Sequence, residues 1–209
     1  MIGPKQKAPS STIILLLANL FPIYGVLFNG WHIVDILFLY WAESAVIGFF
    51  NILKMLTSKI EKGDSVILTV LMRGAASLFF TVHFGGFMLV HGIFIFAIAA
   101  EFYAQPIHPL ALLSDTWIAI VCLFLSHGQS YITNYWINRE RDNSQTGMLM
   151  AQPYARIIIM QLTLIFGLML TMIFGQPIFL LLLFVVLKMI VDLSAHLRER
   201  IKFNALCYY

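Results

Sequence analysis

The chain contains several apolar runs, each long enough to cross a bilayer as a helix. The hydrocarbon core of a membrane is about 30 Å thick, which takes about 20 apolar residues of helix. Of the 209 residues, 60% are hydrophobic and 11% are charged. In a soluble domain, about a quarter of the residues are charged. The chain is therefore predicted to be a single integral membrane domain, residues 1–209, with almost no part outside the lipid bilayer.

These runs predict an all-α polytopic bundle of about six transmembrane helices. Their predicted ranges are 11–29, 31–54, 66–103, 111–137, 155–174 and 177–197. The short breaks "NGW" and "GQP" predict tight hairpins. The third run is too long for one perpendicular crossing, so we expect Gly85 and Gly86 to kink it or to let another backbone approach closely; otherwise one end lies in the interface. The first run is too long for a signal peptide and is expected to be retained.

Most of the basic residues fall in alternate connections between the runs. They are Lys5 and Lys7, then Lys54, Lys59 and Lys62, then Arg139 and Arg141, and finally Arg198, Arg200 and Lys202. Cytoplasmic loops carry the excess of Lys and Arg, and the intervening connections have none. Both termini are therefore predicted to be cytoplasmic.

The charge and cysteine patterns exclude other classes. The net charge of +3 is explained by membrane orientation, and nothing indicates a nucleic-acid partner. Cys122 and Cys207 are far apart and have no CxxC or Cys/His spacing around them. We expect neither a disulfide nor a thiolate metal site.

Several ionisable residues lie deep inside the apolar runs, and six of them are singled out. They are Glu43, His83, His91, His127, Lys188 and Asp192. A charged side chain at the centre of a membrane helix costs about 2.5 to 3.5 kcal/mol on insertion scales, so it usually faces the bundle interior or a wet cavity and has a partner. Function is expected to reside at these positions.

Glu43, His83 and His127 fall at similar depths on three different helices and predict a metal site. Carboxylate and imidazole ligands suit zinc, iron or manganese, and two histidines on different helices suit a haem iron. His91, about two turns beyond His83, is a further ligand if the glycines bend the helix. A structural interpretation also stays open, in which each histidine donates to a carbonyl or pairs with Glu43 and no ion is bound.

A second polar group lies nearer the predicted cytoplasmic side. Lys188, Asp192, His196 and Glu199 share one face of the last helix by their spacing, and Arg156 lies at a similar depth. We predict Lys188, Asp192, His196 and Arg156 as candidate catalytic residues. The group could form a proton path, an anionic head-group site or a catalytic pocket. A salt-bridged helix end is the structural alternative, above all for His196 and Glu199.

A partial motif raises a serine-hydrolase interpretation. Gly128-Gln129-Ser130 in the fourth run, with His196 in the sixth, resembles the rhomboid intramembrane proteases. Where the rhomboid motif would close with glycine, this chain has Tyr131. A Ser–His pair is recognised by its geometry, so this interpretation requires Ser130 to face His196.

Nearly the whole chain resembles an uncharacterised bacterial family of multi-pass inner-membrane proteins, catalogued as a domain of unknown function. The segments that carry the resemblance are "LYWAESAVIGFFNILKM", "VHFGGFMLVHGIFIF", "LFLSHGQSYITNYW", "QPYARIIIMQ" and "LKMIVDLSAHLRER". The matching positions are Glu43, Asn51, His83, His91, His127, Asn134, Pro153, Tyr154, Arg156, Lys188, Asp192 and His196. Gln161 stands where the family pattern often has histidine, which counts against a ligand from the fifth helix. The resemblance implies an inner-membrane location and no particular activity.

Three functions fit these residues. The first is a membrane-embedded metal or haem centre for redox or hydrolytic chemistry on a small or lipid-soluble substrate, with Lys188 or Asp192 as acid–base groups. The second is a small transporter or proton-coupled channel that uses the same residues as a relay. The third is a membrane subunit or assembly factor that packs as a homo-oligomer or against a partner membrane subunit.

Overall fold

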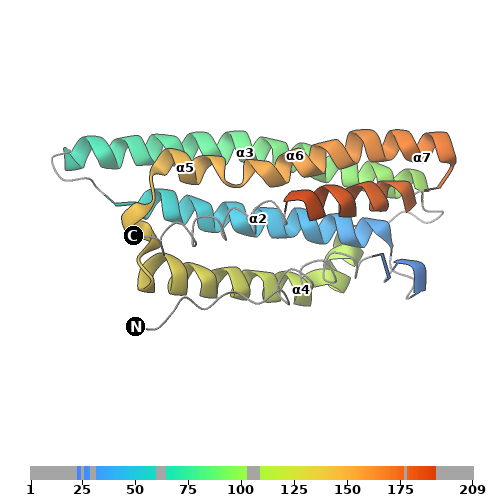
Figure 1. The fold of residues 1–209 in the computed structure, drawn as a ribbon, viewed down its shortest axis with the longest axis horizontal. Helices are drawn as coiled ribbons and strands as arrows, with labels where there is room; N and C mark the ends of the chain where they lie inside the picture. The colour runs from blue at the N-terminus through green and yellow to red at the C-terminus, as the bar shows by residue number, and fades with distance from the viewer. Residues whose placement is uncertain are drawn as a thin grey trace, which may run out of the picture. The chain divides into compact units, whose positions relative to one another are not determined.

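The computed structural model of the protein is all-α (Figure 1). The structure describes residues 23–24, 26–28, 32–59, 65–102, 109–176 and 178–191. Every regular element within these ranges is a helix, which confirms the predicted helical bundle. The chain divides into two compact units, Val34–Gln161 and Met1–Ile33 with Leu162–Tyr209, and each is described by itself.

Three helical stretches among the described residues are long and apolar enough to cross a membrane. They are Ile33–Thr57, Val66–Glu101 and Thr146–Phe174, and a shorter apolar helix covers Ile178–Val191. The protein is therefore a membrane protein, as its composition predicts. The count of about six spans and the orientation stay predictions, since most of run 11–29 and residues 192–197 lie outside the described residues.

The first unit consists of long helices that run lengthwise and alternate in direction (Figure 1). Its elements are α2 (Ile33–Thr57), α3 (Val66–Phe102), α4 (Pro109–Ser130), the π-helix η1 (Tyr131–Ile137), the 3-10 helix η2 (Glu140–Asn143), α5 (Thr146–Ala151) and α6 (Tyr154–Leu162). α4 and η1 follow one another without a gap, so the predicted span 111–137 is helical throughout.

α3 runs unbroken for 37 residues through the Gly85-Gly86 pair. Among the described residues, no atom outside the backbone of α3 itself lies within 4 Å of the place where a side chain on either glycine would begin, and both glycines are exposed. The expected close approach of another backbone is therefore wrong for the described part of the chain, and the pair does not interrupt the helix. At about 1.5 Å per residue α3 is about 55 Å long, which exceeds a hydrocarbon core of about 30 Å even at a tilt of about 40°. At least one end of α3 is therefore expected to extend into the interface, and this alternative stays a prediction.

Close approach between α2 and α3 occurs at two other glycines. A Cβ atom on Gly48 would lie 2.6 Å from the ring of Phe84, and one on Gly92 would lie 3.3 Å from the ring of Trp41. The indole N–H of Trp41 also donates to the carbonyl of Met88 at 2.6 Å. The absence of a side chain at Gly48 and Gly92 therefore lets two aromatic rings lie directly against the neighbouring helix.

A buried apolar cluster joins α2, α3, α5 and α6. Its members are Met55, Phe80, Phe84, Met88, Leu149 and Ile157. Lipid tails are as apolar as these side chains, so in a membrane the stabilisation comes mainly from van der Waals packing. The fit of side chains against one another therefore matters more here than the apolar area that they bury.

The helical stretch Thr146–Phe174 is interrupted at Gln152 and Pro153, between α5 and α6. A proline has no N–H, so the carbonyl of Leu149, four residues earlier, loses its usual helical donor. The side-chain amide of Asn51 donates to that carbonyl at 2.8 Å. The predicted start of the fifth run at residue 155 agrees with the start of α6 within one residue, whereas the apolar helical stretch as a whole begins at Thr146. A membrane helix tolerates proline when a neighbour satisfies the freed carbonyl.

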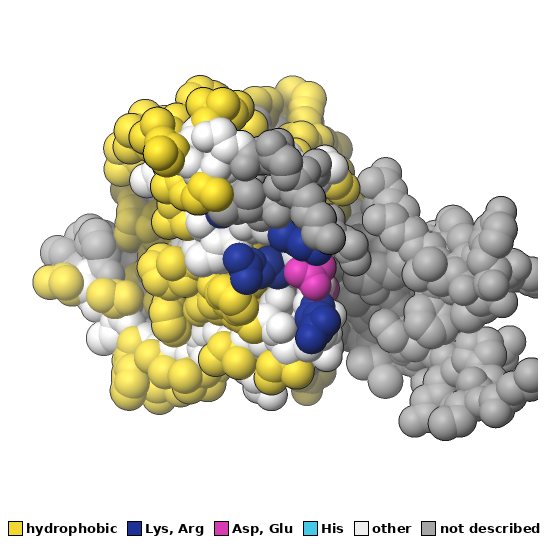
Figure 2. Space-filling view, turned by 90° about the vertical axis from the view of Figure 1, so that its left-hand side faces the viewer, with side chains coloured by type: hydrophobic (Ala, Val, Ile, Leu, Met, Phe, Trp, Pro, Cys, Tyr) yellow, Lys and Arg dark blue, Asp and Glu magenta, His cyan; other side chains and the backbone are white. Residues whose placement is uncertain are grey.

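The C-terminal end of α2 and the segment that follows η1 lie at the same end of the first unit (Figure 1). Lys54 Nζ lies 3.8 Å from Glu140 Oε2, and Lys59 Nζ lies 3.6 Å from Asp142 Oδ1. Figure 2 shows this end, where Lys and Arg side chains surround acidic ones within a largely hydrophobic outline. We call it the basic end. The two groups of basic residues thus share one side, as predicted, and its cytoplasmic location stays a prediction.

The second unit contains a tight helical turn. The π-helix η3 (Thr163–Gly167) and α7 (Leu168–Phe174) end at Gly175, whose φ of +68° is the left-handed conformation that glycine adopts readily. A Cβ atom on Gly167 would lie 3.0 Å from Cα of Leu180, so the helix Ile178–Val191 packs closely against the segment before the turn. This confirms the hairpin predicted at "GQP".

Candidate functional site

Glu43 lies at the centre of a polar group formed by α2, α4 and α6. Its Oε2 atom accepts a charge-assisted hydrogen bond from Nη2 of Arg156. Its Oε1 atom faces Nε2 of His127 at 3.7 Å. Nε of Arg156 donates to Oγ of Ser44 at 3.0 Å. We call Glu43, Ser44, His127 and Arg156 the polar cluster.

The Arg156 side chain is held by several contacts from α2. Besides Glu43 and Ser44, its guanidinium lies over the ring of Tyr40, 4.2 Å from the centroid. The hydroxyl of Ser44 donates in turn to the carbonyl of Tyr40 at 2.8 Å, which turns the oxygen lone pairs of Ser44 toward Arg156. Arg156 lies in the first turn of α6, three residues after Pro153.

The polar cluster is partly buried and its fixed charges balance. The side chains of Glu43, Arg156 and His127 are 24%, 18% and 30% exposed. An ionised residue in a membrane helix normally pairs with an opposite charge in the bundle interior, and Glu43 and Arg156 satisfy this rule together. With a neutral His127, the net charge of the cluster is zero.

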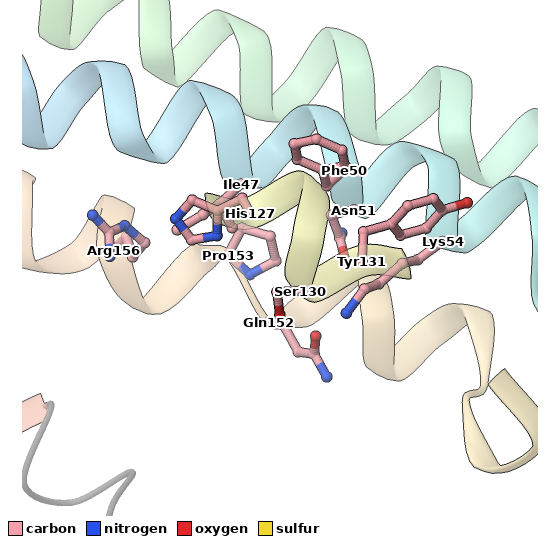
Figure 3. Close-up of a pocket in the computed structure, with 10 residues that line it drawn as sticks. All are labelled: Ile47, Phe50, Asn51, Lys54, His127, Ser130, Tyr131, Gln152, Pro153 and Arg156. Atoms are coloured by element: carbon pink, nitrogen blue, oxygen red, sulfur yellow. The ribbon is translucent and has the colours of Figure 1, made fainter. Parts of the chain in front are cut away.

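A pocket of about 130 Å³ lies beside the polar cluster and extends toward the basic end (Figure 3). His127 and Arg156 line it, and Lys54 lines its other end. Further polar lining comes from Asn51, Ser130, Tyr131 and Gln152. Among the described residues that line the pocket, none is Asp or Glu.

The lining of the pocket is rich in hydrogen-bond donors. His127 lies between Arg156 and Lys54, and the ends of the Lys54 and Gln152 side chains point to the same side (Figure 3). Lys54 is shared with the exposed Glu140, at 3.8 Å. Ammonium, guanidinium, amide and hydroxyl donors form their strongest hydrogen bonds with carboxylate and phosphate oxygens. The pocket is therefore suited to an anionic group.

His83 and His91 lie outside the polar cluster and have partners of their own. Nδ1 of His83 lies 2.7 Å from the hydroxyl of Tyr154. The buried His91 has its Nε2 atom 3.0 Å from Oε1 of Gln161. Of the four residues predicted as metal ligands, only Glu43 and His127 come together. The described part of the chain contains no group of three or more His, Cys, Asp or Glu that could hold a metal ion.

The predicted catalytic residues fall in different parts of the chain. Arg156 belongs to the polar cluster, and Lys188 lies on the helix Ile178–Val191 of the second unit. Asp192 and His196 lie outside the described residues. Ser130, the hydroxyl of the serine-hydrolase interpretation, lines the pocket and accepts a hydrogen bond from Nδ2 of Asn134 at 3.0 Å.

Sequence reasoning missed part of this site. Lys54 was used only to predict the orientation in the membrane, and its place in the pocket was missed. Glu43, Asn51 and Lys54 are spaced at i, i+8 and i+11, so they share one face of α2. Arg73, a cation inside the apolar run of α3, was overlooked, and it is buried. A scan of every run for each charged residue would have found both.

Similarity to known proteins places the chain in a family without assigning an activity. No curated protein and no solved structure matches it. Residues 1–205 match a family model described as "Family of unknown function (DUF6498)", which fits the resemblance seen in the sequence segments around the polar cluster. The chain therefore belongs to the family of unknown function DUF6498.

Proposed function

We propose that the protein is a small membrane transporter that moves an anionic solute together with a proton. The observation that carries the proposal is the position of the Glu43–Arg156 ion pair and His127 at one end of a donor-lined pocket. Each of the three side chains comes from a different helix of one compact unit. The site therefore combines an anion-compatible cavity with a group that can carry a proton.

Charge balance links the anion to the proton. The polar cluster has no net charge while His127 is neutral, and the charge of Lys54 is shared with Glu140 at 3.8 Å. An anion that enters alone therefore adds a negative charge to a membrane-embedded site, which is costly. A proton on an imidazole restores the balance, and histidine is the side chain whose charge changes most readily near neutral pH. Anion and proton are thus each favoured by the presence of the other.

Arg156 is the residue that can exchange partners. Its Nε and Nη2 atoms hold Ser44 and Glu43, and the same side chain lines the pocket. When an anion enters, we expect Arg156 to turn from Glu43 to the anion. A protonated His127, already 3.7 Å from Oε1 of Glu43, then neutralises the carboxylate that Arg156 has left.

The break in the helix supports a transport role. Gln152 and Pro153 stand between α5 and α6 and line the pocket. Discontinuous membrane helices form the substrate sites of many transporters, because an interrupted helix presents polar groups at depth and can bend. We place the protein in the inner membrane of a bacterial cell, on the resemblance of its sequence segments to that class.

Anion binding with proton uptake tests this proposal. Purified protein in mild detergent is titrated calorimetrically with inorganic phosphate, sulfate or succinate, in two buffers of different ionisation enthalpy, which gives the number of protons taken up. At least one of the three anions is expected to bind with net proton uptake. Arg156→Gln is expected to abolish binding, and His127→Ala to abolish proton uptake.

Lys59→Gln is the matched control, because it removes an exposed cation of the basic end that does not line the pocket. It is expected to bind like the wild type. Binding that is unchanged in both Arg156→Gln and His127→Ala, or that involves no proton in the wild type, would contradict the proposal.

A metal centre is a second candidate, favoured by the approach of Glu43 and His127 to 3.7 Å. Catalytic zinc sites have three protein ligands, so this pair would need a further ligand from outside the described residues. Oε2 of Glu43 is also engaged by Arg156. Elemental analysis with an absorption spectrum separates the two candidates: stoichiometric metal or haem that is lost in both Glu43→Gln and His127→Ala would favour the metal centre.

A further inference from the structure

Arg73 of α3 is a buried cation with unused hydrogen-bond donors. Its residue is 7% exposed. Its Nε and Nη2 atoms are closed off from solvent and have no hydrogen-bond partner within the described part of the chain. The hydroxyl of Ser77, one helical turn later, is likewise buried and unpartnered there. Three donors on adjacent turns of α3 thus lack acceptors.

The unused nitrogens of Arg73 form one edge of the guanidinium. Nε and Nη2 point the same way, and this edge binds carboxylate or phosphate through two parallel hydrogen bonds. Arg156 uses the same two atoms to hold Ser44 and Glu43. The Nε–Nη2 edge is thus occupied in Arg156 and unoccupied in Arg73. An oxyanion is the group that matches this edge.

The position of Arg73 along α3 indicates where such an oxyanion would come from. Arg73 lies seven residues after Val66, about 11 Å from the start of the helix at about 1.5 Å per residue. Because α3 is longer than the hydrocarbon core, this turn is expected near the level of the head groups. The apolar side chains of Leu71 and Met72 beside it are exposed, so a lipid molecule can lie against this turn.

We propose that Arg73 and Ser77 bind the phosphate of a phospholipid at the basic end of the bundle. Basic sites between membrane helices on the cytoplasmic side hold anionic head groups, and Arg73 lies near the start of α3, the end of that helix that is close to the basic end (Figure 1). Both nitrogens are closed off from solvent, so neighbouring side chains move apart when the phosphate enters, and the lipid exchanges slowly. The proposal does not depend on the transport function of the pocket.

Thermal unfolding of delipidated protein in detergent tests this site. Phosphatidylglycerol and inorganic phosphate are added separately at matched ionic strength, to wild type, Arg73→Gln and Arg73→Lys. The wild type is expected to gain stability with phosphatidylglycerol. Both variants are expected to lose this gain, because lysine keeps the charge and lacks the two-donor edge. A gain with inorganic phosphate alone, also lost in both variants, would assign the same site to free phosphate.

Arg139→Gln is the matched control, since it removes one exposed positive charge from the same end of the chain. It is expected to respond to lipid like the wild type. Without lipid, Arg73→Gln is expected to unfold no earlier than the wild type, because it removes an unpartnered buried charge. The proposal is overturned if both Arg73 variants keep the full lipid response, or if Arg139→Gln loses it to the same extent.

Discussion

The side-chain amide of Asn51 donates a hydrogen bond of 2.8 Å to the carbonyl of Leu149, 98 residues later in the chain. That carbonyl is the one that Pro153 deprives of a helical donor. Asn51 is buried, and it shares a face of α2 with Glu43 and Lys54. One hydrogen bond therefore fixes the break beside the pocket and joins it to the helix that carries the central carboxylate.

Asn51→Ala is expected to destabilise the protein because the carbonyl of Leu149 then keeps only the 3.3 Å hydrogen bond from the N–H of Gln152. The loss of one hydrogen bond of this kind costs about 1 kcal/mol. Pro153→Ala restores an N–H group to the helix, so Asn51→Ala should cost less when it is combined with Pro153→Ala. Thermal unfolding of the two single variants and the double variant measures this coupling. Equal effects of Asn51→Ala in both backgrounds would show that the break does not depend on Asn51.

Gly48→Ala is expected to destabilise the contact between α2 and α3. The new Cβ atom would lie 2.6 Å from the ring of Phe84, and overpacking of a tight core costs about 1–3 kcal/mol. Gly85→Ala is the control, because no described atom outside the backbone of α3 lies within 4 Å of its Cβ position. It should be neutral or stabilising by up to about 1 kcal/mol, the difference in helix propensity. A lower melting temperature for Gly85→Ala than for Gly48→Ala would contradict the packing described.

Glu43→Gln is expected to destabilise the protein by leaving Arg156 without its carboxylate. The loss of one partner from a buried ion pair costs about 3–5 kcal/mol, and the partial exposure of this pair, 24% and 18%, places the expected value toward the lower limit. The double variant with Arg156→Gln should recover part of the loss. Lys59→Gln, which breaks an exposed pair with Asp142, should cost no more than about 1 kcal/mol.

Because His83 and Tyr154 share one hydrogen bond, removing either side chain's contribution is expected to lower the stability of the protein by a similar amount. His83→Ala and Tyr154→Phe each remove the 2.7 Å hydrogen bond between α3 and α6, with an expected loss of about 1 kcal/mol. The double variant should lose less than the sum, because the two side chains share one interaction. If His83 were a metal ligand instead, His83→Ala would change the metal content and Tyr154→Phe would not.

Much of the fold follows from the apolar pattern alone. The pattern predicts the helical class, the long helix from Val66 and the hairpin at Gly175, because lipid requires every backbone group to be paired within a helix. The early start of the helix at Thr146 could not be predicted. The carbonyl freed by Pro153 accepts from Asn51, a contact with a distant residue that no local pattern reveals.

The candidate site follows from the sequence only in part. Glu43, His127 and Arg156 could be predicted because each is an ionisable residue inside an apolar run. Placing such a residue in a membrane costs free energy, so it usually has a functional or structural role. Depth along a helix could not show that His83 faces Tyr154 and that His91 faces Gln161. The direction in which a side chain points around the helix axis depends on how the helices pack, and the sequence does not give that rotation.

Acidification inside liposomes is the most direct test of coupled anion and proton movement at Glu43, His127 and Arg156. Wild-type protein is reconstituted with a trapped pH-sensitive dye, and an inward gradient of whichever anion binds in detergent is imposed. The interior is expected to acidify with the wild type and with Lys59→Gln, and to stay unchanged with Glu43→Gln and His127→Ala. Acidification that persists in Glu43→Gln, or none with the wild type, would contradict the account.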